Sequence, residues 1–220
     1  MFRALTVSRE FGSGGGRIAV TLARWLGWKL LDNEIILKIA AAARVDSKVV
    51  RHYDEHVDSW LRRMNEDAIR GVALAAGRPL KEEDIFDAHV MDALTRKIIE
   101  EAYDSGNCVI VGRGSQCILQ HKHDCFHVFV YASLRERMER LKKRLEPGAD
   151  IEQRIRVVDA ERAKYLAQRF NRSWCDPHLY DLLIRSREDE DFTARVILNA
   201  MTGNPLPASA MREDAATGKS

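Results

Sequence analysis

The fold of this chain follows from one stretch near its amino terminus, Ser8-Arg9-Glu10-Phe11-Gly12-Ser13-Gly14-Gly15-Gly16-Arg17. An apolar, β-branched run at Ala4–Ser8 precedes it and predicts a buried strand. Apolar residues recur after it at helical spacing, at Ile18, Leu22 and Leu26, and predict a helix. A glycine-rich turn between a strand and a helix is the context of a phosphate-binding loop, because its backbone N–H groups and the helix N-terminus both attract an anion.

The stretch departs from the usual phosphate-loop pattern, G-x-x-x-x-G-K-[ST], at the positions that carry charge and hydroxyl. When the second glycine of the pattern is aligned with Gly14, its first glycine falls on Arg9. The lysine of the pattern then falls on Gly15, and its serine or threonine falls on Gly16. The sequence therefore lacks the usual cation and the usual magnesium-binding hydroxyl.

Two neighbouring residues are candidates for the missing groups. Arg17 can bring positive charge from the first helical turn, and Ser13 can bring a hydroxyl. Arginine is a stiffer, bidentate phosphate ligand than lysine, so the exchange changes geometry as well as identity. A turn that merely connects a strand to a helix is the alternative interpretation.

Length and composition indicate a globular protein with a sizeable core. The chain has 220 residues, and its net charge of only +2 gives no sign of a polyanionic partner such as nucleic acid. The amino terminus has no signal-peptide pattern, and no apolar run is long enough to span a bilayer. We therefore expect a cytoplasmic protein with neither nucleic-acid nor membrane partners.

The cysteines and histidines form no convincing metal motif. A reducing cytoplasm favours free thiols at all four cysteines. A metal could bind the alternating group His121, His123, Cys125 and His127 only if these residues formed one strand. A loop that leads into a strand is the favoured interpretation, and no metal ligand is assigned.

Five short apolar runs predict strands, and helical patterns separate them. Near-continuous apolar runs are typical of strands buried on both faces of a parallel sheet. Strands that alternate with helices indicate a three-layer α/β domain. The five runs are Ala4–Ser8, Trp28–Leu31, Cys108–Gly112, Phe126–Tyr131 and Asp181–Arg185.

Three further segments stand apart from this alternation. Residues 33–107 hold several helical patterns, among them Asp84–Tyr103, and suggest an inserted lobe for the substrate. Residues 134–172 are basic and form two helical patterns, separated at residues 146–150. The last residues, 203–220, are rich in small and polar residues and predict a disordered tail.

Two charged clusters have the spacing of a ligand site. Arg113 stands between two glycines at the end of the third strand, where open α/β sheets bind their ligands. It is a candidate for holding a phosphate or a carboxylate, unless it only pairs with an acidic residue at the sheet edge. Asp159 lies three residues from both Arg156 and Arg162, so all three can share one helix face. Such pairs are commonly exposed and weak, but two arginines on a hinged helix pair can also form a lid over phosphates.

With these clusters, the chain resembles the cytidylate kinase-like family of P-loop nucleoside monophosphate kinases. The resemblance extends over about residues 3–200. Its motifs are Ser8–Gly15, Gly112–Gly114, Tyr131–Arg137, Asp159–Arg162 and Trp174–Asp181. It implies a five-stranded parallel sheet of order 2-3-1-4-5 in one domain at residues 1–202, with an acceptor lobe at 33–107 and a lid at 144–172.

The resemblance also implies roles for single residues, with ATP and Mg²⁺ as cofactors. Arg113 would hold the acceptor phosphate, and Asp32 would face the same cleft. Arg156 and Arg162 would be lid arginines that Asp159 organises, and these three residues would act in catalysis with Arg17 and Arg113. The ATP phosphates would lie against Gly12, Ser13, Gly14, Gly15, Gly16 and Arg17.

The chain differs from true cytidylate kinases in ways that leave its activity and acceptor open. Besides the missing lysine, Gly114 replaces the acidic residue expected after Arg113, and residues 33–107 show no useful similarity. The leading hypothesis is a kinase that moves the γ-phosphoryl group of Mg-ATP onto CMP or dCMP. The alternatives are a nucleotide-binding regulator without turnover and a kinase for a non-nucleotide acceptor. Trp174 and Tyr180 are expected to pack at the sheet edge rather than to contact adenine.

Overall fold

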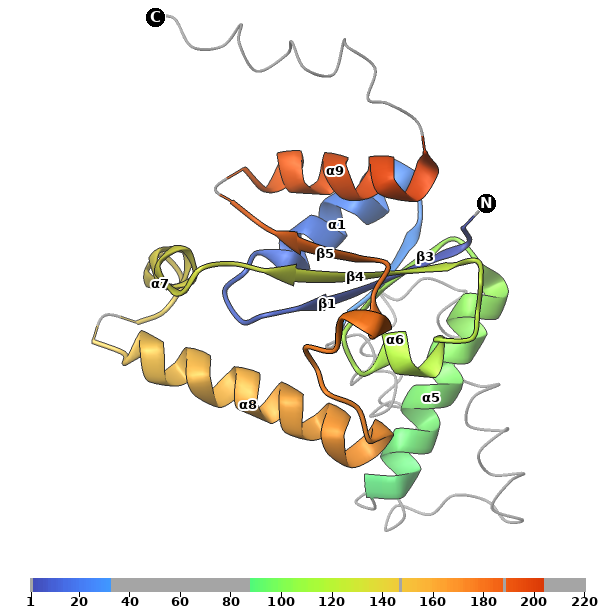
Figure 1. The fold of residues 1–220 in the computed structure, drawn as a ribbon, viewed down its shortest axis with the longest axis horizontal. Helices are drawn as coiled ribbons and strands as arrows, with labels where there is room; N and C mark the ends of the chain where they lie inside the picture. The colour runs from blue at the N-terminus through green and yellow to red at the C-terminus, as the bar shows by residue number, and fades with distance from the viewer. Residues whose placement is uncertain (1, 33–87, 147, 188, 204–220) are drawn as a thin grey trace, which may run out of the picture.

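One parallel sheet forms the centre of the molecule (Figure 1). The computed structural model describes residues 2–32, 88–146, 148–187 and 189–203. The strands lie in the order β2-β3-β1-β4-β5, which confirms the predicted order. Their bounds are Ala4–Arg9 for β1, Lys29–Leu31 for β2, Cys108–Val111 for β3, Cys125–Tyr131 for β4 and Leu182–Arg185 for β5.

The central strand β1 is apolar because it is covered on both faces and paired on both edges. Leu5 lies opposite Val109 of β3 on one side and Phe126 of β4 on the other. Ala4, Leu5 and Val7 are completely buried. The near-continuous apolar runs in the sequence therefore reflect burial on two faces, as predicted.

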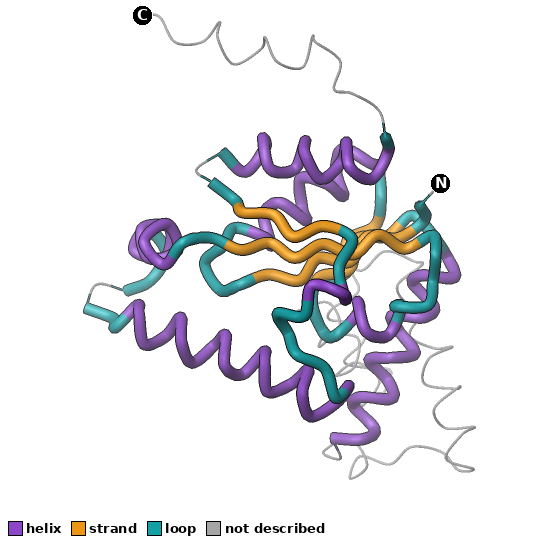
Figure 2. The backbone as a smooth tube through the Cα atoms, viewed as in Figure 1, coloured by secondary structure: helices purple, strands orange, loops and turns teal. Residues whose placement is uncertain are grey.

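Helices cover both faces of the sheet (Figures 1 and 2). Helices α1 and α9 lie on one face and share an apolar core with β1, β3 and β4. Helices α5, α6 and α8 lie on the other face, and α7 lies beyond the carboxyl end of β4. The bounds are Gly15–Leu26 for α1, Ala88–Ser105 for α5, Ser115–Ile118 for α6, Leu134–Lys142 for α7, Ile151–Phe170 for α8 and Glu190–Thr202 for α9.

The two helical patterns expected in residues 134–172 are confirmed as α7 and α8. Helix α5 accounts for the pattern predicted at Asp84–Tyr103 from residue 88 onward. The other patterns in 33–87 and the tail from residue 204 lie outside the described residues. Within the described ranges, every helix is too short or too polar to cross a membrane.

Helix α7 begins at a capping box, which fixes its direction at the carboxyl edge of the sheet. The Ser133 hydroxyl accepts the Glu136 backbone N–H at 3.3 Å, and the Glu136 carboxylate accepts the Ser133 backbone N–H at 2.9 Å. Hydrogen bonds from Ser133, followed by the contact with Arg185, lower the pKa of Glu136 to about 2. The cap therefore positions the arginines that follow it in α7.

A Ser133→Ala variant is expected to lower the free energy of unfolding by about 1 kcal/mol at pH 7, because α7 loses its cap. The folded-state pKa of Glu136 is lower than its unfolded value, so its stabilisation is complete above about pH 4.3 and is lost toward pH 2. The difference between the two proteins should therefore shrink across that window. Urea unfolding at several pH values measures it, and an equal midpoint at pH 7 would contradict the capping role.

Candidate functional site

The loop between β1 and α1 has the backbone geometry of an anion-binding turn. Gly12 and Gly14 have φ angles of +81° and +84°, a left-handed conformation that favours glycine. Gly14 is the N-cap of α1 and offers no side chain to the free N–H groups of the first turn. Gly16 is exposed, and no heavy atom lies within 4 Å of where its Cβ would be. The first turn of α1 is therefore uncovered at Gly16, whereas the Glu190 carboxylate lies against Gly14. Exposed N–H groups at a helix start favour an anion such as phosphate.

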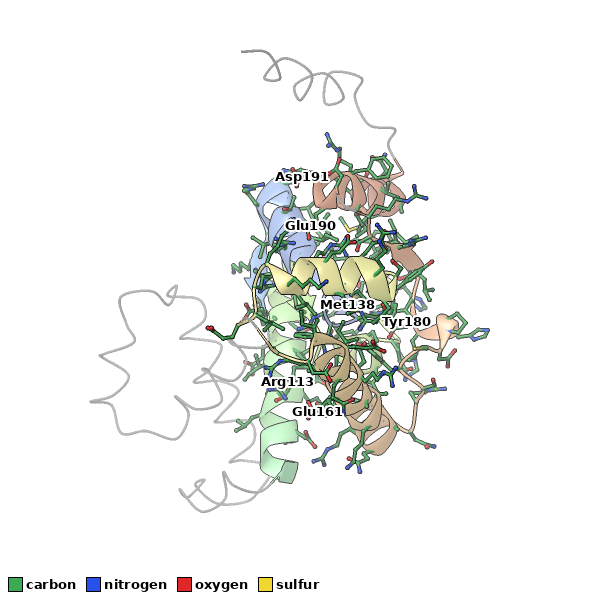
Figure 3. All side chains as sticks on the ribbon, turned by 90° about the vertical axis from the view of Figure 1, so that its left-hand side faces the viewer. Arg113, Met138, Glu161, Tyr180, Glu190 and Asp191 are labelled. Atoms are coloured by element: carbon green, nitrogen blue, oxygen red, sulfur yellow. The ribbon has the colours of Figure 1, made fainter. Side chains whose placement is uncertain are left out.

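Ser13 and Arg17 make contacts that differ from those expected of phosphate ligands. Ser13 is buried, and its hydroxyl accepts the Gly15 N–H at 3.3 Å, so it serves the loop itself. The Arg17 guanidinium donates to Glu190 of α9 at 2.6 Å, and its side chain is 58% exposed. In Figure 3, Glu190 and Arg113 lie on opposite sides of α7. Arg17 is thus held on the α9 side of the loop.

A cavity of about 330 Å³ opens next to the loop, at the carboxyl edge of the sheet. Three arginines line it, namely Arg9 from β1, Arg113 after β3 and Arg162 of α8. Glu161 is the acidic residue in its wall, and it lies near Arg113 in Figure 3. Such a concentration of positive charge in a partly enclosed space favours a small anion.

Arg113 lines the cavity and has a buried nitrogen without a partner in the described part of the chain. Its Nε is buried and has no hydrogen-bond acceptor among the described residues. Its backbone is left-handed, with φ +57°, as are Gly112 and Gly114 beside it. A buried N–H without an acceptor costs free energy, which a bound phosphate or carboxylate would recover. The phosphate-holding role of Arg113 stays a prediction.

Gly114 explains one departure from true cytidylate kinases. A Cβ at this position would collide with the ring of Phe170, at the carboxyl end of α8. The acidic side chain expected after Arg113 therefore has no room here. The ring of Phe170 from α8 instead fills the space beside the β3–α6 turn.

Arg9 also lines the cavity, and the sequence pattern gave it no role as a ligand. Its guanidinium packs directly over Gly112, where any Cβ would collide with it. Burial, then the charge of Arg162 and also that of Arg113, lower the pKa of Arg9 to about 10, while Asp32 acts in the opposite direction. Asp32 directly follows β2, and its charge acts on Arg9, which lines the cavity. The signal that could have identified Arg9 was its place at the first glycine of the loop pattern.

Asp159 ties α8 to the loop. Its carboxylate accepts the Phe11 backbone N–H at 2.8 Å and forms an ion pair with Arg137 of α7. Arg137 in turn donates from Nε to the Phe11 carbonyl at 2.7 Å and pairs with Glu10 at 3.3 Å. The second partner of Asp159 is Arg162, at 3.8 Å, and Arg162 donates to the Arg9 carbonyl at 2.8 Å. Asp159 therefore holds both the loop, through Phe11, and the side chain of Arg162.

The expectation that Arg156 shares Asp159 with Arg162 is wrong. Arg156 pairs with Glu152, one helical turn earlier, at 2.5 Å, and its side chain is 70% exposed. The carboxylate of Asp159 already contacts the Phe11 N–H of the loop and Arg137 of α7. The exposed Arg156 pairs elsewhere. The lid role of Arg156 stays a prediction.

Two residues of the histidine and cysteine segment, Cys125 and His127, are buried in β4. His127 is buried in β4, where its Nδ1 forms a 2.7 Å hydrogen bond with the Thr6 hydroxyl. Burial lowers the pKa of His127 and raises that of the Cys125 thiol. The structure forms no group of three metal-ligating side chains within these ranges, and all four cysteines are free thiols.

Trp174 and Tyr180 pack in the core, as expected. Their rings contact Phe129 of β4, with centroid separations of 5.3 Å and 5.1 Å. The Tyr180 hydroxyl donates to the Trp174 carbonyl at 2.8 Å, which links the two ends of this segment. Trp174 also forms part of the cavity wall, so these packed aromatic rings lie next to the three arginines.

The sheet order and the glycine-rich loop between β1 and α1 together define a P-loop kinase fold. The model of one family, described as the cytidylate kinase-like family, matches residues 4–188. The chain belongs to this family. It therefore has a kinase-type scaffold, with the arginine cavity at the edge where such folds bind their ligands.

Solved structures resemble the chain along most of its length. An uncharacterized protein from Eubacterium ventriosum aligns with a TM-score of 0.64 at 19% identity, covering 92% of this chain and 99% of that one. A shikimate kinase from Acinetobacter baumannii, solved with shikimate, aligns with a TM-score of 0.47 at 14% identity, covering 94% and 97%. At 19% identity the first likeness shows the fold alone. The comparison with curated proteins gave no match.

Proposed function

We propose that the chain is an ATP-dependent phosphotransferase that moves the γ-phosphoryl group of Mg-ATP onto a nucleoside monophosphate such as CMP or dCMP. The observation that carries this proposal is the buried Nε of Arg113, which has no acceptor among the described residues, beside a cavity that Arg113, Arg9 and Arg162 line. Transfer between two phosphates brings several negative charges together, and three arginines at one sheet edge match that requirement.

The residues divide the work by their position. The loop from Gly12 to Gly16 would hold the phosphates of ATP through its backbone N–H groups. Arg113 would hold the acceptor phosphate, and Arg162 would neutralise charge on the transferring group. Arg17 would reach the phosphates only by exchanging its contact with Glu190.

The loop by itself offers no hydroxyl for Mg²⁺, because Gly16 replaces the usual serine or threonine and Ser13 is used within the loop. Mg²⁺ commonly binds through substrate phosphates and waters with few protein ligands. We therefore assign the ion mainly to the nucleotide. Asp32 is the carboxylate at this edge that would order its waters.

A nucleotide-binding regulator without turnover is the second candidate. The observation in its favour is that Gly15 and Gly16 replace the lysine and the hydroxyl of the usual loop. These two groups position the γ-phosphate and Mg²⁺ for transfer, and a protein that only binds a nucleotide could hold it through other contacts.

ADP release from Mg-ATP, with each common ribo- and deoxyribonucleoside monophosphate offered in turn, tests these functions. We expect turnover that depends on CMP or dCMP, because Arg113 provides a site for the acceptor phosphate. Nucleotide binding without ADP release across the whole panel would favour the regulator. ATP binding with no competition from any monophosphate would favour a kinase for a non-nucleotide acceptor.

A further inference from the structure

Gly15 occupies the position of the usual P-loop lysine, and its surroundings have no room for a side chain. A Cβ on Gly15 would lie 2.5 Å from the Cβ of Arg9 and 3.1 Å from its Cγ. The Cβ of Val130 would be 3.3 Å away. The first distance is too short for a real contact and the second is tight, so the stem of Arg9 fills the space where a lysine stem would begin.

The head of Arg9 lies farther along the same edge. It rests on Gly112 and lines the cavity with Arg113 and Arg162. Burial and the charges of Arg162 and Arg113 lower the pKa of this guanidinium, while the charge of Asp32 raises it. An arginine with two further arginines beside it, in a planar fork of five N–H donors, favours a bound anion.

The sequence and the structure thus show the same exchange. At the two loop positions where other P-loops carry glycine and lysine, this chain carries Arg9 and Gly15. Arg9 in this position requires glycine at residue 15, because a side chain there would overlap the stem of Arg9. Gly112 completes the arrangement, since its missing side chain makes room for the guanidinium.

We propose that Arg9 takes over the phosphate-binding task of the missing P-loop lysine, and that it reaches the ATP phosphates from the end of β1 rather than from the start of α1. This inference rests on the proposed function and deepens it. The expected ligand is the β- or γ-phosphate of a nucleoside triphosphate. An arginine there also offers two parallel N–H donors where lysine offers a point charge.

Equilibrium binding of ATP, ADP and AMP, measured by competition with a fluorescent ATP analogue, tests the assignment. Arg9→Met keeps the stem over Gly15 but removes the charge. We expect ATP to bind about 10- to 100-fold more weakly to it, with AMP affinity little changed, because AMP lacks the phosphates concerned. Arg24→Met, at an exposed arginine in the last turn of α1, is the charge-matched control and should bind all three nucleotides normally.

The decisive variant restores the usual order by combining Arg9→Gly with Gly15→Lys. It should recover ATP affinity to within about threefold of the wild type, whereas Gly15→Lys alone should lose it, because the two stems overlap. Thermal unfolding checks that each variant is folded. If Arg9→Met does not fold, the double variant decides, and weak ATP binding by the folded double variant overturns the proposal.

The remaining outcomes separate this inference from the proposed function. Unchanged ATP affinity in folded Arg9→Met, or a loss confined to the acceptor CMP, overturns the role of Arg9 and leaves the phosphotransferase standing. Selective loss of ATP affinity in a protein that turns over no acceptor supports Arg9 and removes the kinase activity. A wild-type protein that binds no ATP overturns both.

Discussion

An Arg113→Met variant is expected to lose about 10²- to 10³-fold in kcat/KM for phosphoryl transfer, because it removes a buried donor from the acceptor site. Among the described residues, the Nε of Arg113 is buried and has no acceptor, so we expect the acceptor phosphate to provide one. Initial rates of ADP release at saturating Mg-ATP, with the acceptor concentration varied, measure the effect. The apparent affinity for ATP should change little, and most of the loss should appear in kcat/KM for the acceptor.

The same variant is expected to keep its stability, and this separates a functional role from a structural one. Arg113 lies close enough to Arg9 for their charges to repel, so replacing it with methionine removes a cost of folding. The melting temperature should therefore stay the same or rise slightly. Arg24→Met serves as the control for activity, because Arg24 is exposed on α1. An Arg113→Met protein with normal turnover, or one that unfolds, would contradict the assignment.

The largest expected loss of stability follows from replacing Arg137 with methionine, at about 3–5 kcal/mol. The side chain of Arg137 is only 8% exposed, and it lies between the carboxylates of Glu10 and Asp159. Without it, two partly buried carboxylates face each other, and the Phe11 carbonyl loses its donor. Urea unfolding at neutral pH measures the change.

Arg156→Met is the matched control for this stability experiment. Arg156 also pairs with a carboxylate, that of Glu152, but its side chain is 70% exposed. Its removal is expected to cost less than about 0.5 kcal/mol, because exposed ion pairs are screened by solvent. If both variants lost equally little stability, the network around Asp159 would not hold the loop to α7 and α8.

The sequence predicted the features that depend on local patterns. Glycine content and a strand-to-helix transition identify the loop at residues 8–17, and buried apolar runs identify the five strands. Arg113 was predictable because a residue just after a parallel strand must lie at the ligand edge of the sheet. Spacing alone was also sufficient to recognise α7 and α8.

Contacts between distant residues could not be predicted in this way. Asp159 and Phe11 are 148 residues apart in the chain, yet they form one hydrogen bond. Helical spacing correctly suggested a contact between Asp159 and Arg162, but it also suggested Arg156, because periodicity does not reveal which carboxylate a neighbouring helix has already occupied. Arg137 becomes a partner of Asp159 because α7 packs beside the loop between β1 and α1.

Arg9 shows the same division within a single motif. From the sequence one can tell that the loop carries an arginine in place of its first glycine and a glycine in place of its lysine. The folded chain adds that the stem of Arg9 covers Gly15 and that its guanidinium rests on Gly112 in the cavity. The difference arises because backbone pattern is encoded locally, whereas the space available to a side chain is set by the strands and helices that pack around it.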